Sequence, residues 1–150
     1  MPVEDPAELV EFLQPYPLEV QELMLEGRRF LLDLLWPVTE LFFDATQAVC
    51  SGFAYMGGVR ESFVNLAAYS DHVTLVFGWG ARLDDPEKRL NGSGNQVRHL
   101  RLKGMETLED PYVVGLIRQA SANAPKPDGP VEPKQIVKIY NGPKKRPGPR

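Results

Sequence analysis

The first 36 residues carry apolar positions at the spacing of amphipathic helices. The run Asp5-Pro6-Ala7-Glu8 is typical of a helix start, because Asp5 can accept hydrogen bonds from first-turn amides and Pro6 has no amide to leave unpaired. A longer helix is expected after Pro17 and ends before Pro37, since proline disfavours the helical conformation in the residue before it. Its apolar stripe repeats at intervals of three and four and consists of Val20, Leu23, Met24, Gly27, Leu31, Leu34 and Leu35.

From Thr39 onward the pattern predicts strands. A short apolar segment at 40–43 is followed by two alternating segments, 63–69 and 72–79, whose two-residue connection suits an antiparallel hairpin. Residues 97–103 alternate again, and Asp110-Pro111 is expected to begin the last helix. This order predicts an α+β fold, with an antiparallel sheet packed with helices, two N-terminal helices and one C-terminal helix.

The composition changes after Ala124. Residues 125–150 contain seven of the 14 prolines, so we expect a domain over 1–124 followed by a proline-rich basic tail that is extended or disordered. Within the tail Ile136, Val137, Ile139 and Tyr140 form an apolar island. The island either adds a strand to a sheet edge or binds a partner.

The net charge of −3 conceals two regions of opposite sign. Residues 1–124 hold ten Lys and Arg against 18 Asp and Glu, which gives −8. The tail holds seven basic and two acidic residues, which gives +5. With 150 residues, 43% of them hydrophobic and 25% charged, the chain has the proportions of one globular domain rather than a fibrous or wholly disordered protein.

The sequence predicts a cytoplasmic protein with no membrane span. Cys50 is the only cysteine, so an intramolecular disulfide is impossible. Residues 1–14 carry four carboxylates and no Lys or Arg, which is the opposite of the basic start of a signal peptide. The longest apolar run, 30–38, is far shorter than the roughly 20 residues that cross a bilayer.

Three stretches resemble the YdhG-like domain family (DUF1801), a family of unknown function. They are Cys50-Ser51-Gly52-Phe53-Ala54-Tyr55, the Ala-Ala-aromatic hairpin followed by a histidine at 63–73, and residues 94–102. The chain departs from the family because no proline follows Ser51-Gly52 and Trp79 with its neighbours replaces a Tyr-Pro ending. The resemblance covers about 17–122 and implies an antiparallel sheet backed by helices. Some members look like frataxin-like iron chaperones, and the family has no catalytic motif to transfer.

Two groups of side chains have the chemistry of iron ligands. Glu19, Glu22 and Glu26 share one face of the long helix, and carboxylate oxygens are the ligands that hard cations prefer. His72 and His99 lie on one sheet face by parity, so with a carboxylate they would form a non-heme iron site if their strands are neighbours. The alternatives are a solvated acidic helix face and surface histidines.

No catalytic signature is present, so the sequence does not indicate an enzyme. Cys50 beside Ser51-Gly52 would be a thiol nucleophile only if a histidine activated it, and a lone cysteine among apolar neighbours is more often a small buried hydrophobe. The glycine-rich run at 91–95 lacks the Gly-Lys-Ser/Thr of a phosphate loop.

The basic tail suggests a partner. Lys144, Lys145 and Arg146 would bind phosphates through counterion release, or the tail solubilises the chain or folds back onto the acidic body. The sequence therefore predicts a binding protein with weak, exchangeable iron as its ligand. The alternative is an interaction module that binds a protein or polyanion through the sheet face or the basic tail.

Overall fold

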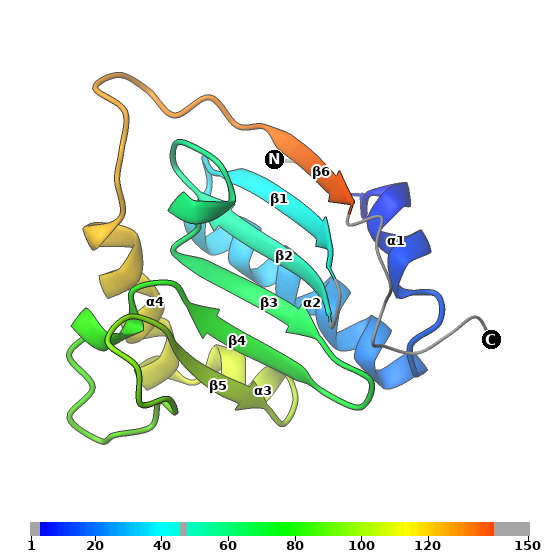
Figure 1. Ribbon diagram of the computed structural model, residues 1–150, viewed down its shortest axis with the longest axis horizontal. Helices are drawn as coiled ribbons and strands as arrows, with labels where there is room; N and C mark the ends of the chain where they lie inside the picture. The colour runs from blue at the N-terminus through cyan, green and yellow to red at the C-terminus, as the bar shows by residue number, and fades with distance from the viewer. Residues whose placement is uncertain (1–3, 46–47, 140–150) are drawn as a thin grey trace.

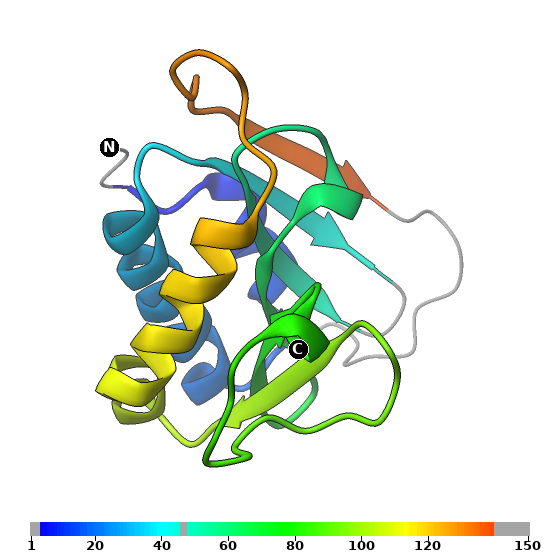
Figure 2. The same ribbon diagram turned by 90° about the vertical axis from the view of Figure 1, so that its left-hand side faces the viewer.

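The computed structural model describes residues 4–45 and 48–139, which form two layers. One layer is a six-stranded sheet, and the other is a set of helices packed on a single face of that sheet (Figures 1 and 2). No described helix covers the opposite face, which we call the open face (Figure 2). The predicted α+β class is confirmed.

The sheet is mixed rather than purely antiparallel. Its strands are β1 (Thr39–Asp44), β2 (Val49–Ala54), β3 (Val64–Ala68), β4 (Val73–Phe77), β5 (Arg98–Leu102) and β6 (Gln135–Ile139). In space their order is β5-β4-β3-β2-β1-β6, and every neighbouring pair is antiparallel except β1 and β6. The predicted hairpin is β3 and β4, closed by a bond from the Tyr69 amide to the His72 carbonyl at 2.8 Å.

Four helices form the second layer. They are α1 (Ala7–Leu13), α2 (Leu18–Leu35), α3 (Met105–Glu109) and α4 (Pro111–Asn123), with single 3-10 turns η1 (Val59–Glu61) and η2 (Gly80–Arg82) in the loops. The single C-terminal helix that we expected is therefore a pair, because the short α3 precedes α4. None of the described helices has the length and apolar character needed to cross a membrane.

The two predicted helix caps behave differently. Asp110 caps α4 as expected, since its Oδ1 accepts a hydrogen bond from the Tyr112 amide at 2.9 Å. Asp5 does not cap α1, where Pro6 is the capping residue and no side chain bonds the first-turn amides. Instead the Asp5 carboxylate pairs with Arg28 and Arg29 of α2, because two guanidinium groups hold a carboxylate more strongly than exposed amides do.

The core lies between α2, α4 and the helix-facing side of the sheet. Val20, Met24, Gly27, Leu31 and Leu35 of the predicted α2 stripe are buried, as expected. Leu32 and Arg28 are buried as well, so this helix is covered over a wider arc than the stripe indicates. The helix-facing residues of β4, which are Val73, Leu75 and Phe77, are fully buried as the alternation predicts.

Strand β6 comes from the proline-rich segment. The chain leaves α4 at Ala124, passes along one end of the sheet and places Gln135–Ile139 beside β1 in parallel register (Figure 1). Of the two alternatives for the apolar island, residues 136–139 thus take the first, a strand at a sheet edge. The placement of the domain boundary near Ala124 stays a prediction.

Candidate functional site

The open face combines basic charge with aromatic rings. Because register partners share a face and side chains alternate along a strand, we can assign each strand residue to one side. The open face receives His99 and Arg101 from β5 and Lys138 from β6, which are exposed and lie at opposite edges of the sheet, and no carboxylate from any described strand. Between them, the side chains that β1, β2 and β3 direct to this face include the buried Leu41, Ala54 and Ala67. The two strand carboxylates, Glu40 and Asp44, face the helices.

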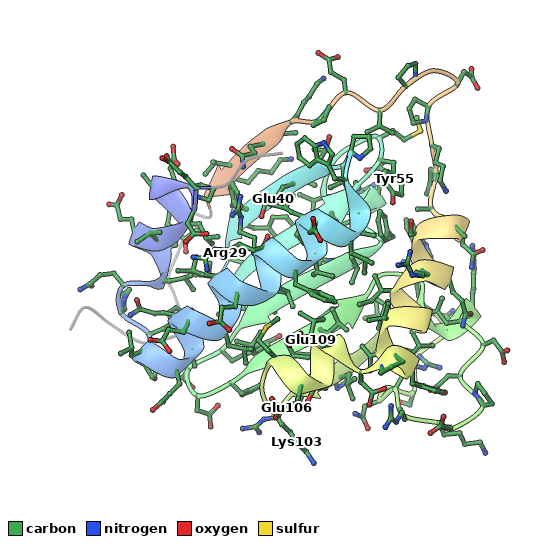
Figure 3. All side chains as sticks on the ribbon, turned by 180° about the vertical axis from the view of Figure 1, so that it is seen from behind. Arg29, Glu40, Tyr55, Lys103, Glu106 and Glu109 are labelled. Carbon is green, nitrogen blue, oxygen red and sulfur yellow. The ribbon has the colours of Figure 1, made fainter. Side chains whose placement is uncertain are left out.

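The carboxylates of the fold gather on the helix layer instead. Helices α1 to α4 carry eight Asp and Glu against three Arg. Seen from the helix side, Glu106 and Glu109 project from α3 (Figure 3). The helices therefore carry an acidic excess, whereas the strand side chains on the open face carry only basic charge.

A shallow hollow of about 310 Å³ lies on the open face across β4 and β5. Its lining contains one tyrosine, two histidines and no carboxylate: Tyr69, His72, Thr74, Val76, Val97 and His99. Arg101 is exposed and is the cross-strand partner of Thr74, so a permanent positive charge lies beside the hollow. Its side chain lines a neighbouring hollow that also contains Glu19 and Asp71.

One end of the hollow is a stacked ring pair. The Tyr69 and His72 rings lie 5.0 Å apart between centroids and 15° from parallel. His72 Nδ1 is 2.7 Å from Asp71 Oδ1, and this hydrogen bond holds the pKa of the exposed Asp71 carboxyl below its usual range. Partial burial raises the pKa of Tyr69, so its hydroxyl stays protonated. The stack presents a fixed aromatic surface in the hollow.

The two histidines share the open face, as parity predicts, and their strands are neighbours. However, His99 is the register partner of Val76, which is four residues from His72. At about 3.3 Å per residue this offset separates the two positions by roughly 13 Å along the strands. No group of three or more His, Cys, Asp or Glu side chains in residues 4–45 and 48–139 is placed to hold a metal ion.

The acidic residues of the predicted iron site lie apart from most of this face. Glu19, Glu22 and Glu26 are exposed on α2, in the helix layer. Only Glu19 borders a hollow that also reaches Asp71 and His72, at the end of the β3–β4 hairpin. The structure thus brings one of the three glutamates near one of the two histidines.

Cys50 also belongs to the open face, as the cross-strand partner of Phe43 and Ala67. Burial raises the pKa of its thiol to about 12. A nucleophilic or metal-binding cysteine needs the thiolate, which this environment disfavours at neutral pH. The side chain therefore behaves as the small hydrophobe of the alternative reading.

A buried ion pair under the sheet was not expected from the sequence. Arg28 of α2 donates from Nε to Glu40 Oε2 at 2.7 Å and from a terminal nitrogen to Glu40 Oε1 at 3.0 Å. Ser51 of β2 donates to the same carboxylate at 2.8 Å, and Gln135 of β6 at 3.4 Å. Burial raises the pKa of Glu40, and the hydrogen bonds from Arg28 and Ser51 offset part of that rise. This network joins α2, β1, β2 and β6.

Two features of the sequence could have indicated this pair. Arg28 directly follows Gly27 of the apolar stripe, and Glu40 opens an otherwise apolar strand segment, so each is a charge beside positions that the pattern assigns to the core. A lone buried charge is costly, which means that two such residues are each other's natural partners.

The remaining predicted site, Lys144, Lys145 and Arg146, lies outside the described residues. Comparison of the chain with protein family models, curated proteins and solved structures finds no match. The resemblance to the YdhG-like family accordingly stays a prediction.

Proposed function

We propose that the protein binds single-stranded nucleic acid through the β4–β5 part of the open face of its sheet. The observation that carries the proposal is the separation of charge: this part has His99 and Arg101 on β5 beside the Tyr69–His72 ring pair of the hairpin connection, whereas both strand carboxylates face the helices. Proteins that hold single strands without a strict sequence preference combine positive charge along the backbone with aromatic rings on which bases stack.

The hollow supplies both elements within one small area. The Tyr69–His72 stack offers a ring surface for a base, and Arg101 offers a guanidinium for a neighbouring phosphate. A shallow hollow on a sheet suits an unpaired strand, whose bases are free to turn toward the protein, better than a duplex whose bases are stacked inside. The acidic helix layer repels the phosphates and so favours docking on the open face.

Exchangeable iron binding, which the family resemblance implies, has less support in the geometry. The proposed ligands are spread over the two layers, and His72 already bonds Asp71. A nucleic acid is bound along an extended surface and not at one point, so His72 and His99 can contact it at separate positions.

The test is a fluorescence anisotropy titration with a labelled 12-nucleotide dT strand and a 12-base-pair duplex at several salt concentrations. We expect the single strand to bind more tightly than the duplex. Tyr69→Ala should weaken single-strand binding about 5- to 100-fold, the range for loss of one stacked base. Arg101→Gln should lower the salt slope by about 0.7, because one phosphate contact is lost.

The matched control is Arg118→Gln, which removes an exposed arginine from α4 in the helix layer. It should leave binding unchanged. Equal losses in Arg101→Gln and Arg118→Gln would mean that only net charge matters, and the open face would not be the site. A chain that ends at Ile139 separates the tail from the face: retained binding supports the open face, and complete loss assigns binding to Lys144, Lys145 and Arg146.

A further inference from the structure

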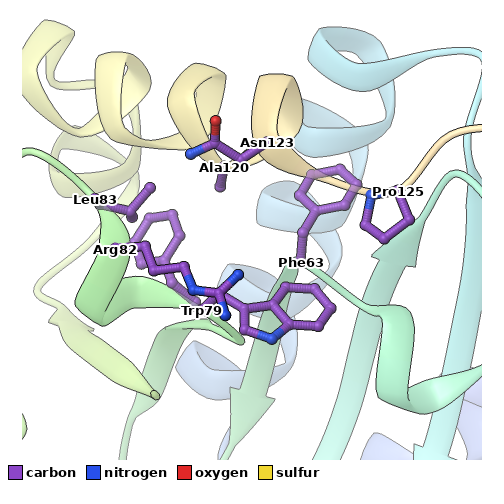
Figure 4. A pocket seen from close by; sticks show the side chains of 8 residues that line it. Phe63, Trp79, Arg82, Leu83, Ala120, Asn123 and Pro125 are labelled. Atoms are coloured by element: carbon purple, nitrogen blue, oxygen red, sulfur yellow. The ribbon is translucent and has the colours of Figure 1, made fainter. Parts of the chain in front are cut away.

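A second cavity lies on the helix side of the sheet, behind the Val76 end of the hollow on the open face. It has a volume of about 180 Å³, is partly open to solvent and lies between the end of β4, the η2 turn and the C-terminal end of α4 (Figure 4). Phe63, Phe77, Trp79 and Ala120 form apolar walls, while Arg82 and Asn123 are its polar lining side chains.

The size of the cavity selects a single ring. An apolar cavity of about 150 Å³ accepts a benzene molecule, so this cavity takes one six-membered ring with little space left over. Phe63 and Phe77 are 1% and 0% exposed and form the floor, so the half-buried Trp79 is the aromatic wall on which a planar ring can stack.

The charge of the cavity selects an anion. Arg82 is exposed, and it forms no ion pair with any residue of the described ranges. Its side chain lies across the Trp79 side of the cavity, and Asn123 lies opposite on α4 (Figure 4). No carboxylate lines the cavity. A guanidinium without an ion-pair partner is suited to a carboxylate, which it can bind with two parallel hydrogen bonds.

The end of α4 would oppose an anion if its carbonyls were free, because a helix C-terminus carries partial negative charge. Lys126 removes this obstacle. Its Nζ donates to the carbonyl oxygens of Ser121 at 2.7 Å, Ala122 at 3.1 Å and Ala124 at 3.2 Å. The ammonium group thus compensates the helix end beside the cavity.

We propose that this cavity binds a small aromatic carboxylate of one ring, with the ring against Trp79 and the carboxylate on Arg82. The proposal is independent of nucleic-acid binding, because it uses none of the residues of the open face.

The test uses benzoate as the probe and benzyl alcohol as its neutral counterpart, followed through the two tryptophan indole N–H signals in NMR spectra. For a ligand of this size we expect a dissociation constant on the order of 1 mM. Benzoate should shift the Trp79 signal saturably, leave Trp36 unchanged and bind about two- to fivefold more tightly than benzyl alcohol, as one exposed charge contact allows. Arg82→Gln should abolish this preference while both probes still bind.

Ala120→Phe fills the cavity and should abolish binding of both probes, and Ala120→Leu provides a milder second variant if the first does not fold. Arg118→Gln is the charge control and should keep the preference for benzoate. The proposal is overturned if wild type does not distinguish the two probes, if Arg82→Gln keeps the preference, or if benzoate binds the folded Ala120 variants as before.

Discussion

Replacing Arg28 with methionine tests whether the buried ion pair supports the fold. The Arg28 and Glu40 side chains are 0% and 1% exposed, so neither can turn to water when the other is removed. In Arg28→Met the Glu40 carboxyl keeps Ser51 and Gln135 as donors but loses its bidentate guanidinium. Methionine fills a similar volume, so the substitution removes charge more than packing.

The expected loss of unfolding free energy is about 3–5 kcal/mol at pH 7, the range for removing one partner of a buried pair. For a chain of this length that lowers the melting temperature by roughly 10 °C. Arg29→Met is the matched control, since it makes the same change one residue along α2 at a side chain that is 51% exposed. There the loss should stay below about 1 kcal/mol.

Chemical denaturation of four chains completes the test: wild type, Arg28→Met, Glu40→Gln and the double variant. Glu40→Gln should lower the free energy of unfolding less than Arg28→Met does, because Arg28 still has an ion-pair partner in Asp5, 3.3 Å away. The double variant should be more stable than the two single losses together predict, since it leaves no unpaired buried charge. Strictly additive losses, or an Arg28→Met loss no larger than that of Arg29→Met, would refute the reasoning.

The pH dependence provides an internal check. Burial raises the pKa of Glu40 in the folded chain above its unfolded value of 4.5. As pH rises, the unfolded chain therefore loses this proton first. The contribution of Glu40 to the free energy of unfolding falls until the pH has passed the folded pKa. Removing Arg28 raises the folded pKa further. The stability gap between wild type and Arg28→Met should therefore widen from pH 4.5 to pH 7.

Three further predictions concern separate parts of the fold. The raised pKa of Cys50, about 12 against an ordinary 9.0, should make alkylation by iodoacetamide at pH 9 about 500-fold slower in the folded chain than in urea, as followed by mass spectrometry; equal rates would contradict it. Asp110→Ala should cost about 1 kcal/mol in urea denaturation because α4 loses its cap, whereas Asp110→Asn keeps an acceptor and most of the stability. A chain that ends at Ile139 should keep the stability of the full chain, whereas one that ends at Lys134 loses β6 and should be about 1–3 kcal/mol less stable.

The sequence predicted the elements whose periodicity is set by one buried face. The α2 stripe and the alternation of β4 each have one side against the core, and the structure buries these residues, except that Leu23 and Leu34 of the stripe are only partly buried. The pattern was less informative for β2, where Cys50, Gly52 and Ala54 on the open face are as small or apolar as the residues facing the helices. A strand whose two sides resemble each other has no clear period.

Long-range pairing explains what the sequence did not predict. Asp5 matches the local rule for a helix cap, but Arg28 and Arg29, more than 20 residues away, compete for its carboxylate. The parallel direction of β6 likewise follows from where α4 ends, not from any residue in Gln135–Ile139. The distance between His72 and His99 could not be predicted from the alternation of side chains, which indicates only the sheet face on which each residue lies. The distance depends on the register between β4 and β5.

The charge division along the chain is not the charge division in space. By sequence, the basic excess begins after Ala124, yet β6 brings Lys138 of that segment onto the same sheet face as Arg101 from the acidic part of the chain, at the opposite edge of the sheet. The acidic excess is held on the helices behind the sheet. A field of this kind orients a polyanion before contact, and its effect should disappear at high salt. Salt should therefore slow association of the dT strand more than it speeds dissociation, and stopped-flow rates with the reverse ratio would argue against electrostatic steering by this face.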